Sequence, residues 1–347
     1  MPIQFRQIDD LSSPERLGEI VGPVESIVHM ALATVGFSQA QHERLTVHLK
    51  DGSQVKLVLK RFRLADSWTA YRTGDTVGRE AALLTEPALG SVWQVFRNPY
   101  RALAIEGGEI GLLMTDLTDT LVPDEGSAIT EIQQELFLRS LAGLHARFWE
   151  SDALYLPWLA PLSARFHILH PTSSTEELNR ANAAPVFTLV QRGWGIALQK
   201  LPDRIATLLQ RPAEQTAGDF SHLPKTLLHG DTKLANFGFC DRGGVAAFDW
   251  ATMGKGPATV DLGYCLAINS ARLPSDKEQV IARYRRLLER ELHRQIPPGA
   301  WDDMVTLAIV AGAGMLLWSK ALALDAGTPG AAADWAWWVA QLERRLG

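Results

Sequence analysis

Four side chains that could carry chemistry lie close together in the second half of the chain. The stretch "LLHGDTKLANF" (residues 227–237) holds Asp231, Lys233 and Asn236, and "AFDWA" places Asp249 thirteen residues after that asparagine. A carboxylate can accept the proton of an attacking hydroxyl, and carboxylate and amide oxygens are ligands suited to Mg²⁺. Phosphoryl transfer needs these groups at one place. The spacing therefore predicts Asp231 as a base and Asn236 with Asp249 as metal ligands.

The segment ahead of this stretch is rich in strand patterns. Residues 25–34, 43–50 and 55–62 are β-rich, and apolar and polar residues alternate most clearly in the second of them. The Asp-Gly pair within residues 51–53 tolerates the positive φ of a tight turn, so it predicts a hairpin. The predicted order is three strands, a helix over residues 75–86, and two strands over residues 101–107 and 109–117.

Helical patterns dominate the remainder of the chain. Within residues 130–151, Phe137, Leu141, Leu144 and Phe148 follow one another at spacings of four, three and four. These spacings place the four side chains on one face of a helix, so that face is predicted to be buried.

These patterns predict an α+β protein of two lobes. A β-rich lobe, residues 1–117, precedes a mostly helical lobe, residues 118–347, which is about twice its size. Residues 227–249 interrupt the helical lobe as a predicted strand–loop–strand segment.

The composition and net charge of the chain are those of a globular protein and argue against nucleic acid as a partner. Hydrophobic residues make up 46% of the chain and charged residues 21%, which is ordinary for a globular protein. The net charge of −5 provides no basic footprint, so nucleic acid is not expected as the main partner. The two cysteines, Cys240 and Cys265, have no metal-ligand spacing and are expected to be small buried hydrophobes in a reducing compartment.

No membrane partner is expected either. Residues 1–10 turn charged at once and contain no apolar signal-peptide core. The longest apolar run, residues 305–318, has fourteen residues, fewer than a bilayer-spanning helix needs, and it predicts a buried core helix. The sequence therefore predicts a cytoplasmic protein.

The loop "HGDTKLAN" resembles the catalytic loop of the aminoglycoside phosphotransferase and choline kinase group, whose fold is similar to that of protein kinases. "FDW" stands where that group has its second metal-binding aspartate, and residues 256–267 match its Gly-Pro-x-x-x-Asp-Leu segment. Residues 138–149 are similar to the Leu-Ala-x-Leu-His segment of the same group. The resemblance covers most of the chain and implies an ATP-dependent transfer of phosphate to an alcohol group of a small molecule, with Mg²⁺.

The resemblance also implies roles for further residues. Lys60 matches the strand lysine that contacts the α- and β-phosphates, and Glu80 matches the helix glutamate that pairs with it. Asp261 is expected to brace the catalytic loop by hydrogen bonds, and Lys233 to offset charge on the transferred group. The linker whose backbone meets adenine is expected at Met114, Thr115, Asp116 and Leu117.

The sequence departs from the protein kinase pattern in three places. No Gly-x-Gly-x-x-Gly joins the first two strands, because the turn over residues 34–43 has one glycine. Asp249, Trp250 and Ala251 replace Asp-Phe-Gly, and no Ala-Pro-Glu segment follows. A small-molecule kinase is therefore favoured over a protein kinase.

Several of these residues also have simpler interpretations. A lone strand lysine such as Lys60 is usually a solvated charge, and the segment around Glu80 is good helix sequence in any case. His229 precedes a Gly turn and has no second histidine at metal-ligand spacing, so a structural role is favoured.

The C-terminal tryptophans allow two interpretations that differ in the chemistry of the acceptor site. Helix packing is favoured for Trp301, Trp318, Trp335, Trp337 and Trp338, and an apolar or aromatic wall around the acceptor is the alternative. A polycationic aminoglycoside would need clustered carboxylates, but those of the C-terminal segment are scattered: Asp302, Asp303, Asp325 and Asp334. An antibiotic acceptor is therefore not favoured.

Two other classes of function compete with the kinase hypothesis. The first is a catalytically silent nucleotide-binding module with the same fold, and the presence of Lys60, Asp231, Asn236 and Asp249 counts against it. The second is a metal-dependent hydrolase, which lacks a His-rich ligand set and does not explain the β-rich lobe.

Overall fold

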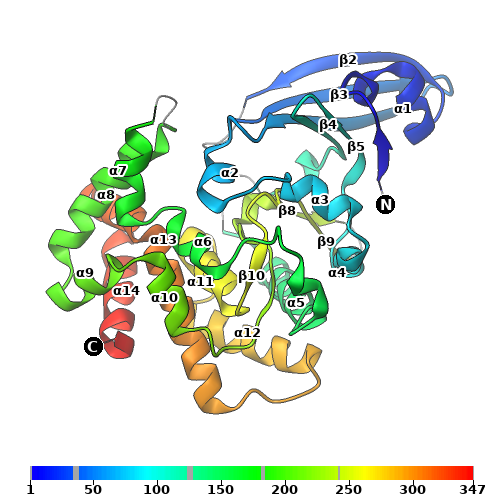
Figure 1. The fold of residues 1–347 in the computed structure, drawn as a ribbon. Coiled ribbons are helices and arrows are strands. Elements are labelled where there is room, and N and C mark those ends of the chain that lie inside the picture. Colours follow the sequence, from blue (N-terminus) through cyan, green and yellow to red (C-terminus); the bar gives the residue numbers. More distant parts are fainter. Residues whose placement is uncertain (1, 34–38, 123–127, 181–183, 241–242, 347) are drawn as a thin grey trace.

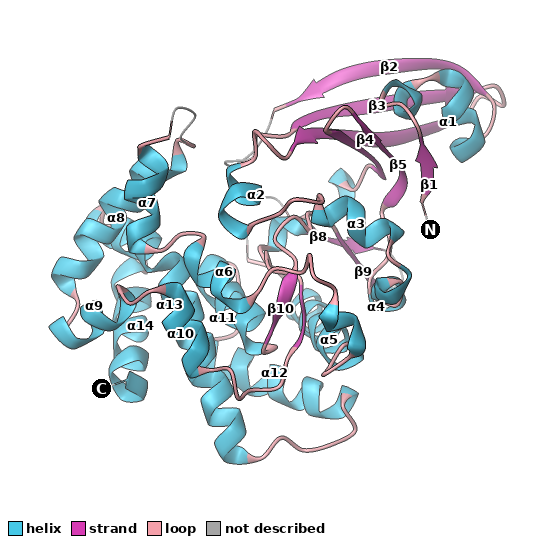
Figure 2. Ribbon diagram, viewed as in Figure 1, coloured by secondary structure: helices cyan, strands magenta, loops and turns pink. Residues whose placement is uncertain are grey.

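The computed structural model describes the chain except for residues 1, 34–38, 123–127, 181–183, 241–242 and 347. A six-stranded sheet forms the first lobe and the second lobe is mostly helical, so the predicted two-lobed α+β fold is confirmed (Figures 1 and 2). The strands lie in the order β1-β5-β6-β4-β3-β2. Their bounds are β1 Ile3–Phe5, β2 Val24–Leu32, β3 Gln41–Leu49, β4 Gln54–Arg63, β5 Tyr100–Glu106 and β6 Glu109–Thr115.

The alternation of side chains along β4 decides which of them face the second lobe. Leu57 and Leu59 are buried in a cluster with Leu17 of α1 (Pro14–Val21), which covers one face of the sheet. Successive side chains of a strand point to opposite faces, so Lys60 points away from this cluster. The same alternation that fills the core of the first lobe therefore presents Lys60 to the other face.

The predicted order of three strands, a helix and two strands is confirmed by β2, β3, β4, α3 (Arg79–Thr85), β5 and β6. At the predicted hairpin turn, Asp51 accepts a hydrogen bond from the Ser53 backbone N–H at 2.8 Å. The end of the first predicted strand, at residue 34, lies outside the described residues. The prediction missed β1, α1 and the short helices α2 (Trp68–Thr73) and α4 (Val92–Val95).

The helix predicted over residues 75–86 begins later than expected. The carboxylate of Asp75 accepts hydrogen bonds from the backbone N–H groups of Val77, Gly78 and Arg79 at 2.9–3.1 Å. These hydrogen bonds hold residues 75–78 in a turn, and α3 starts only at Arg79, after the N-cap residue Gly78. Glu80 therefore lies in the first turn of α3, where the helix dipole favours a negative charge.

The second lobe adds helices and two small antiparallel strand pairs, β7 with β10 and β8 with β9. The β8–β9 hairpin was not anticipated within the predicted strand–loop–strand segment. The strand bounds are β7 Thr226–Leu228, β8 Phe237–Cys240, β9 Gly244–Ala247 and β10 Gly254–Gly256. The helix bounds are α5 Glu131–Arg147, α6 Leu162–His167, α7 Pro171–Leu178, α8 Val186–Lys200, α9 Asp203–Leu209, α10 Ala213–Asp219, α11 Thr259–Ile268, α12 Lys277–Glu291, α13 Pro298–Asp325 and α14 Ala331–Leu346.

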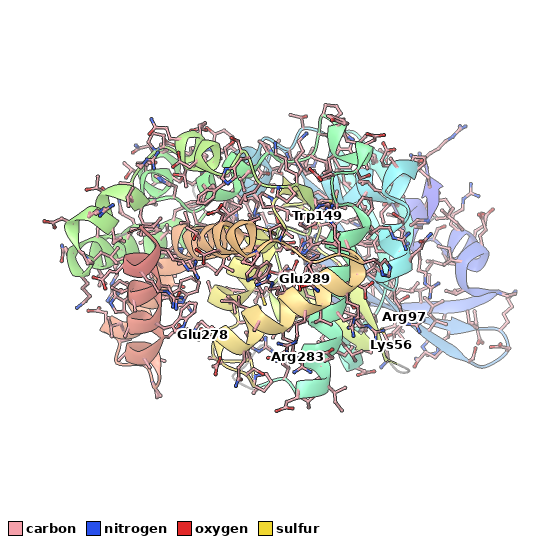
Figure 3. The ribbon with its side chains drawn as sticks, turned by 90° about the horizontal axis from the view of Figure 1, so that it is seen from below. Lys56, Arg97, Trp149, Glu278, Arg283 and Glu289 are labelled. Atoms are coloured by element: carbon pink, nitrogen blue, oxygen red, sulfur yellow. The ribbon has the colours of Figure 1, made fainter. Side chains whose placement is uncertain are left out.

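The apolar stripe predicted for the helix over residues 130–151 is present in α5. On the underside of the molecule, α12 packs along α5, and Arg283 of α12 forms an ion pair with Glu135 of α5 (Figure 3). The four residues of the stripe are buried: Phe137, Leu141, Leu144 and Phe148.

The long helix α13 lies at the centre of the second lobe. It has 28 residues, which is longer than the predicted apolar run. Among the described residues it alone is long and apolar enough to span a membrane, yet 72% of its apolar window is buried inside the protein. It packs so closely on α11 that a Cβ at Gly263 would lie 2.0 Å from the Ala308 carbonyl oxygen. The helix is therefore a buried core helix, as predicted.

Candidate active site

Asp261 in α11 holds the loop that carries Asp231. Its carboxylate accepts hydrogen bonds from the backbone N–H groups of His229 at 2.7 Å and Gly230 at 3.0 Å. The hydroxyl of Thr232 donates to the backbone carbonyl oxygen of Asp261 at 2.8 Å. The predicted bracing of this loop by Asp261 is therefore confirmed.

His229 and Gly230 shape the loop. Gly230 has φ +85°, and a Cβ there would lie 2.2 Å from the backbone oxygen of Thr252, so only glycine fits. The His229 ring accepts a hydrogen bond from the Asp231 backbone N–H at 3.2 Å and donates one to the Phe248 carbonyl oxygen at 3.1 Å. Burial lowers the pKa of His229 to about 4, so the ring is neutral near neutral pH. These contacts agree with the predicted structural role.

Three bracing residues were not assigned from the sequence. His145 of α5 lies 3.3 Å from the Asp261 carboxylate through Nε2, and its Nδ1 pairs with the Tyr284 hydroxyl of α12. Asn269 donates to the Thr232 carbonyl oxygen at 2.9 Å and accepts from the Leu234 backbone N–H at 3.0 Å. Asn269 is the C-cap residue of α11, eight residues after Asp261, and the sequence carried no clear signal for its role.

Lys60 is held between two carboxylates from different parts of the chain. Its Nζ lies 2.7 Å from Glu80 Oε2 and 2.9 Å from Asp249 Oδ1. The other oxygen of Glu80 accepts hydrogen bonds from the Tyr100 hydroxyl at 2.6 Å and the Asp249 backbone N–H at 3.1 Å. Burial alone would lower the pKa of Lys60, but the charges of Asp249 and Glu80 outweigh it and raise that pKa. Lys60 is therefore a fixed cation, and the predicted Lys60–Glu80 pair is present.

Asp249 adopts an unusual backbone conformation. Its φ is +61°, in the left-handed region that few residues other than glycine adopt. The hydrogen bond from its N–H to Glu80 and the ion pair with Lys60 hold it there, while 37% of its side chain stays exposed. Local strain of this kind is concentrated at functional sites. The geometry leaves part of the carboxylate open to a ligand.

One cavity of about 370 Å³ brings together six of the residues predicted for the site. Both lobes contribute to it, and its size suits a small-molecule site. The turn predicted over residues 34–43 lies partly outside the described residues, but Gln39 and Ala40 line this cavity. The six residues that share the cavity are Lys60, Glu80, Asp231, Lys233, Asn236 and Asp249.

The predicted adenine linker lies elsewhere in the described structure. Thr115 and Leu117 line a second cavity of about 620 Å³, together with Arg97 and Arg101. Met114 is buried in β6, and the carboxylate of Asp116 accepts a hydrogen bond from Arg44 Nε at 2.6 Å. Contact between these four residues and a nucleotide remains a prediction.

Asp231 is buried in the lining of the shared cavity. The side-chain amide of Asn236 donates to its backbone oxygen at 3.0 Å, which ties the two ends of the loop together. Burial raises the pKa of Asp231 to about 6, and the negative charge of Asp249 acts in the same direction. Its Oδ1 is buried and has no hydrogen-bond partner among the described residues. A donor supplied by a ligand would satisfy this oxygen.

Of the five C-terminal tryptophans, Trp318 alone lines the cavity among the described residues. Its indole N–H donates to the Met315 carbonyl oxygen at 2.9 Å, and the first lobe adds Trp68 to the same cavity. Packing therefore accounts for Trp301, Trp335, Trp337 and Trp338, and the aromatic wall around an acceptor stays a prediction for Trp318.

The acidic residues of the C-terminal segment are paired away from the cavity. Asp334 lies between Lys277 at 2.7 Å and Lys320 at 2.9 Å. Asp302 pairs with Arg345, Asp303 with His222 and Asp325 with Arg192. None of these four carboxylates lines the candidate cavity. The C-terminal segment therefore adds no carboxylate to the described cavity walls that could bind a polycationic acceptor.

The two cysteines differ in burial. Cys265 is buried, and burial raises its pKa to about 12, so it remains a thiol. Cys240 is only half-buried and lines the second cavity, so the expectation of a buried hydrophobe was wrong for Cys240. Its place at the end of the β8–β9 hairpin explains the difference, since hairpin ends lie at the surface.

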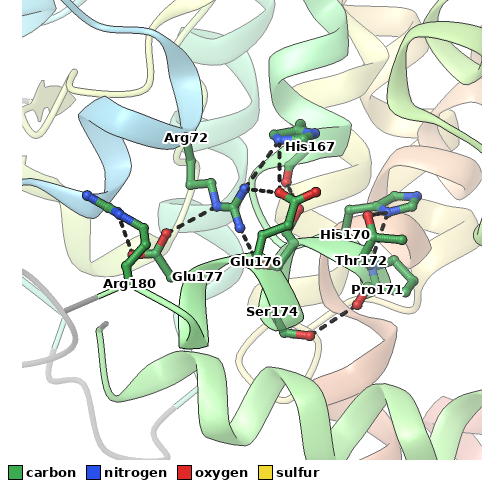
Figure 4. Close-up of polar contacts among 10 residues, drawn as sticks. Arg72, His167, His170, Pro171, Thr172, Ser174, Glu176, Glu177 and Arg180 are labelled. Atoms are coloured by element: carbon green, nitrogen blue, oxygen red, sulfur yellow. Dashed lines mark hydrogen bonds and ion pairs between the residues drawn. The ribbon is translucent and has the colours of Figure 1, made fainter. Parts of the chain in front are cut away.

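An ion-pair cluster joins the lobes beside the cavity (Figure 4). Arg72 of α2 lies 2.8 Å from Glu176 and 3.4 Å from Glu177, and Arg180 lies 2.7 Å from Glu177. Because α2 also contributes Trp68 to the cavity wall, this cluster fixes one side of the wall to α7 of the second lobe.

The side chains present fit a magnesium ion bound together with phosphates. The side-chain amide of Asn236 donates to the backbone oxygen of Asp231, which leaves its own oxygen available to a metal, and Asp249 keeps an exposed part of its carboxylate. No group of three or more His, Cys, Asp or Glu side chains with metal-binding geometry occurs among the described residues. Mg²⁺ is commonly held by one or two protein oxygens, with phosphates and waters completing the shell. Two oxygen ligands are therefore sufficient.

The raised pKa of Asp231 predicts a pH dependence of turnover. If Asp231 acts as a base, it must be ionised, so kcat is expected to fall as pH drops through about 6, approaching a tenfold loss per pH unit. A profile of kcat that stays flat between about pH 5 and pH 7 would contradict this assignment.

The same shift predicts a pH dependence of stability. The folded pKa is higher than the unfolded one, so protonated Asp231 favours the folded state at low pH, and this contribution disappears as pH rises through about 6. The Asp231→Asn variant lacks it, so its melting temperature relative to wild type should be higher at about pH 8 than at about pH 5. An equal difference at both pH values would show that Asp231 titrates normally.

The chain matches one protein family and has distant likenesses among solved structures. The model of a phosphotransferase enzyme family matches residues 36–296. An aminoglycoside-3'-phosphotransferase of type VIII is 15% identical, with 88% of this chain and 98% of that chain covered and a TM-score of 0.47. A choline kinase from Streptococcus pneumoniae is 12% identical, with 95% and 97% covered and a TM-score of 0.48.

A macrolide 2'-phosphotransferase from Brachybacterium faecium is 15% identical, with 92% of this chain and 95% of that chain covered and a TM-score of 0.44. A search of curated protein sequences found no match. Likenesses this distant do not show which molecule the chain acts on. The family match covers three quarters of the chain and includes the braced loop, Lys60 and Asp249, and the chain belongs to the phosphotransferase enzyme family.

Proposed function

We propose that the protein transfers the γ-phosphoryl group of ATP to a hydroxyl group of a small molecule. The observation that supports this most strongly is the convergence in one cavity of a carboxylate-held lysine, Lys60, with the base Asp231. In this proposal residues 1–117 bind the nucleotide, and residues 118–347 carry the catalytic loop and the acceptor site. The cytoplasmic location remains a prediction.

The chain's own residues have separate tasks in the reaction. Asp231 orients the acceptor hydroxyl and accepts its proton, and its unpartnered Oδ1 is the atom available for this contact. Lys60 contacts phosphate oxygens and is held for that purpose by Glu80. Lys233 lies in the same cavity and offsets the charge of the transferred group.

Asn236 and Asp249 would hold Mg²⁺ in this proposal. When bound, the ion would neutralise charge on the phosphates. Asp249 is already positioned for this by the hydrogen bond of its N–H to Glu80, and Asn236 by its hydrogen bond to the backbone of Asp231. In such chemistry, positioning and electrostatics supply most of the rate acceleration.

Replacing Lys60 tests the nucleotide half of the proposal. ATP with Mg²⁺ should raise the melting temperature of the wild-type protein, because a ligand that binds only the folded state stabilises it. Lys60→Ala should lose most of that rise, since the cation that contacts the phosphates is gone. Lys56→Ala is the matched control, because Lys56 lies on the same strand but is exposed (Figure 3).

An ATP-induced rise of equal size in Lys60→Ala and Lys56→Ala would remove Lys60 from the site. A normal rise in the wild type without turnover of any alcohol would instead favour the silent nucleotide-binding module. If ATP and Mg²⁺ leave the melting temperature of the wild type unchanged, the hydrolase alternative gains support.

A further inference from the structure

Arg165 of α6 is a buried cation without a full set of partners. Arg165 is only 2% exposed. Its Nε and Nη1 atoms have no hydrogen-bond partner among the described residues. Nη2 lies 3.6 Å from the sulfur of Met315, which is a weak acceptor, and the guanidinium lies 5.6 Å from the centre of the Tyr264 ring. Guanidinium groups are rarely buried without an anion, because the loss of hydration is costly.

Arg165 and Asp231, each with unpartnered polar atoms, belong to the lining of the same cavity. Arg165 and Asp231 both line it, and the positive charge of Arg165 lowers the pKa of Asp231, so the two side chains are close enough to interact. The hydroxyl of Thr252, in the same lining, is also buried without a partner among the described residues. The Oδ1 atom of Asp231 lacks a donor, and Nε and Nη1 of Arg165 lack an acceptor. One molecule with a hydroxyl and an anionic group would satisfy both.

The walls around Arg165 indicate the rest of the ligand. The second lobe contributes apolar side chains to the cavity that Arg165 lines, among them Ile168, Leu169, Val186 and Trp318. The carboxylates in the lining belong to residues already used by the site or by the turn before α3, namely Asp75, Glu80, Asp231 and Asp249. The positive charge of Arg165 would repel an ammonium group bound next to it, whereas an apolar or aromatic group would pack against the apolar side chains of the lining.

We propose that the acceptor is an anionic hydroxy compound, whose carboxylate or phosphate group binds Arg165 while its hydroxyl lies at Asp231. This inference rests on the proposed phosphoryl transfer and names its substrate class. The hydroxyl oxygen bonds to the γ-phosphorus of ATP, and the bond from that phosphorus to the bridging oxygen breaks. ADP leaves with the electron pair of that bond, and the hydroxyl proton passes to Asp231.

A set of matched alcohols tests the charge preference. Mandelate, mandelamide and phenylethanolamine share an aromatic ring and a hydroxyl but carry an anionic, a neutral and a cationic group. Glycerol phosphate separates a phosphate ester from a carboxylate as the source of the anion. Release of ADP is measured for each, and stabilisation by each is measured in the presence of a non-hydrolysable ATP analogue. The anionic compounds should be preferred in both measurements.

Two substitutions connect this preference to Arg165. Arg165→Met should raise KM for the anionic acceptor about tenfold or more and abolish the preference over the neutral amide, while Arg165→Lys should keep part of it. Arg63→Met is the matched control, because Arg63 lines the same cavity but is exposed and pairs with Glu109 at 3.3 Å. The melting temperature of unliganded Arg165→Met should be equal to or higher than that of wild type, because an unpaired buried charge is removed.

The outcomes separate this inference from the proposed function. Equal use of the amide or the amine by the wild type, or an unchanged preference in Arg165→Met, would overturn the anionic acceptor and leave phosphoryl transfer standing. In a second outcome, mandelate or glycerol phosphate stabilises the wild type but not Arg165→Met, and no ADP is released. This outcome would support the anion site and count against phosphoryl transfer. If neither anion gives stabilisation or turnover that depends on Arg165, the inference is overturned. A large fall in the melting temperature of unliganded Arg165→Met would assign Arg165 a structural role instead.

Discussion

Replacing Asp231 with asparagine is expected to lower kcat by roughly 10²-fold to 10⁴-fold, the range found when a positioned general base is removed. Asparagine keeps the size and shape of the side chain but cannot accept the hydroxyl proton. The loop should keep its structure, because its hydrogen bonds run through Asp261, Asn236 and backbone groups of the loop. The measurement is kcat for phosphorylation of an identified acceptor, with the ATP-induced melting shift recorded in parallel.

The control for this substitution is Asp303→Asn. Asp303 is a largely exposed aspartate of the second lobe that pairs with His222 at 3.7 Å and does not line the cavity. The Asp303→Asn variant should retain the kcat of the wild type. If Asp231→Asn also retains wild-type kcat, Asp231 is not the base, and if it loses the ATP-induced shift as well, the substitution has disturbed the nucleotide site.

Replacing Asp249 with asparagine is expected to lower kcat by roughly 10²-fold or more, because a charge that holds the metal near the phosphates is lost. Folding should be less affected, since Lys60 keeps its ion pair with Glu80 at 2.7 Å and is not left as an uncompensated buried charge. The stabilisation by ATP should lose its dependence on Mg²⁺ in this variant. Melting temperatures with ATP, measured with Mg²⁺ and with a chelator, check this directly.

Asp303→Asn again provides the control. In that variant and in the wild type, adding a chelator should reduce the ATP-induced stabilisation. A variant Asp249→Asn that keeps both its turnover and its Mg²⁺-dependent stabilisation would show that other residues hold the metal.

The sequence predicted those parts of the protein that depend on local patterns. The β-rich residues 55–62 after the Asp-Gly turn predicted β4, and the spacing of Phe137, Leu141 and Leu144 predicted α5. The loop from His229 to Asn236 was recognisable because several unusual residue types recur there at fixed spacing. These signals depend on residues near one another in the chain.

The parts that the sequence did not reveal depend on contacts between distant residues. β1 is three residues long and pairs in parallel with β5, roughly a hundred residues away, so no hairpin signal marks it. The start of α3 moved because Asp75 bonds to backbone N–H groups. Arg165 was not singled out, because nothing in the neighbouring residues shows that an arginine is buried. Its exposure is decided by α13 and by Tyr264 of α11, which pack over it.

The most direct test of the proposed phosphoryl transfer follows the phosphate itself. ATP labelled at the γ-phosphate is incubated with Mg²⁺, the protein and a pool of small-molecule alcohols that includes mandelate and glycerol phosphate, and the products are separated. The wild type should move the label into an organic phosphate ester, and Asp231→Asn should do so at roughly a hundredth of the rate or less. Label that appears only as inorganic phosphate, or that remains in ATP although the protein binds the nucleotide, would contradict a small-molecule kinase.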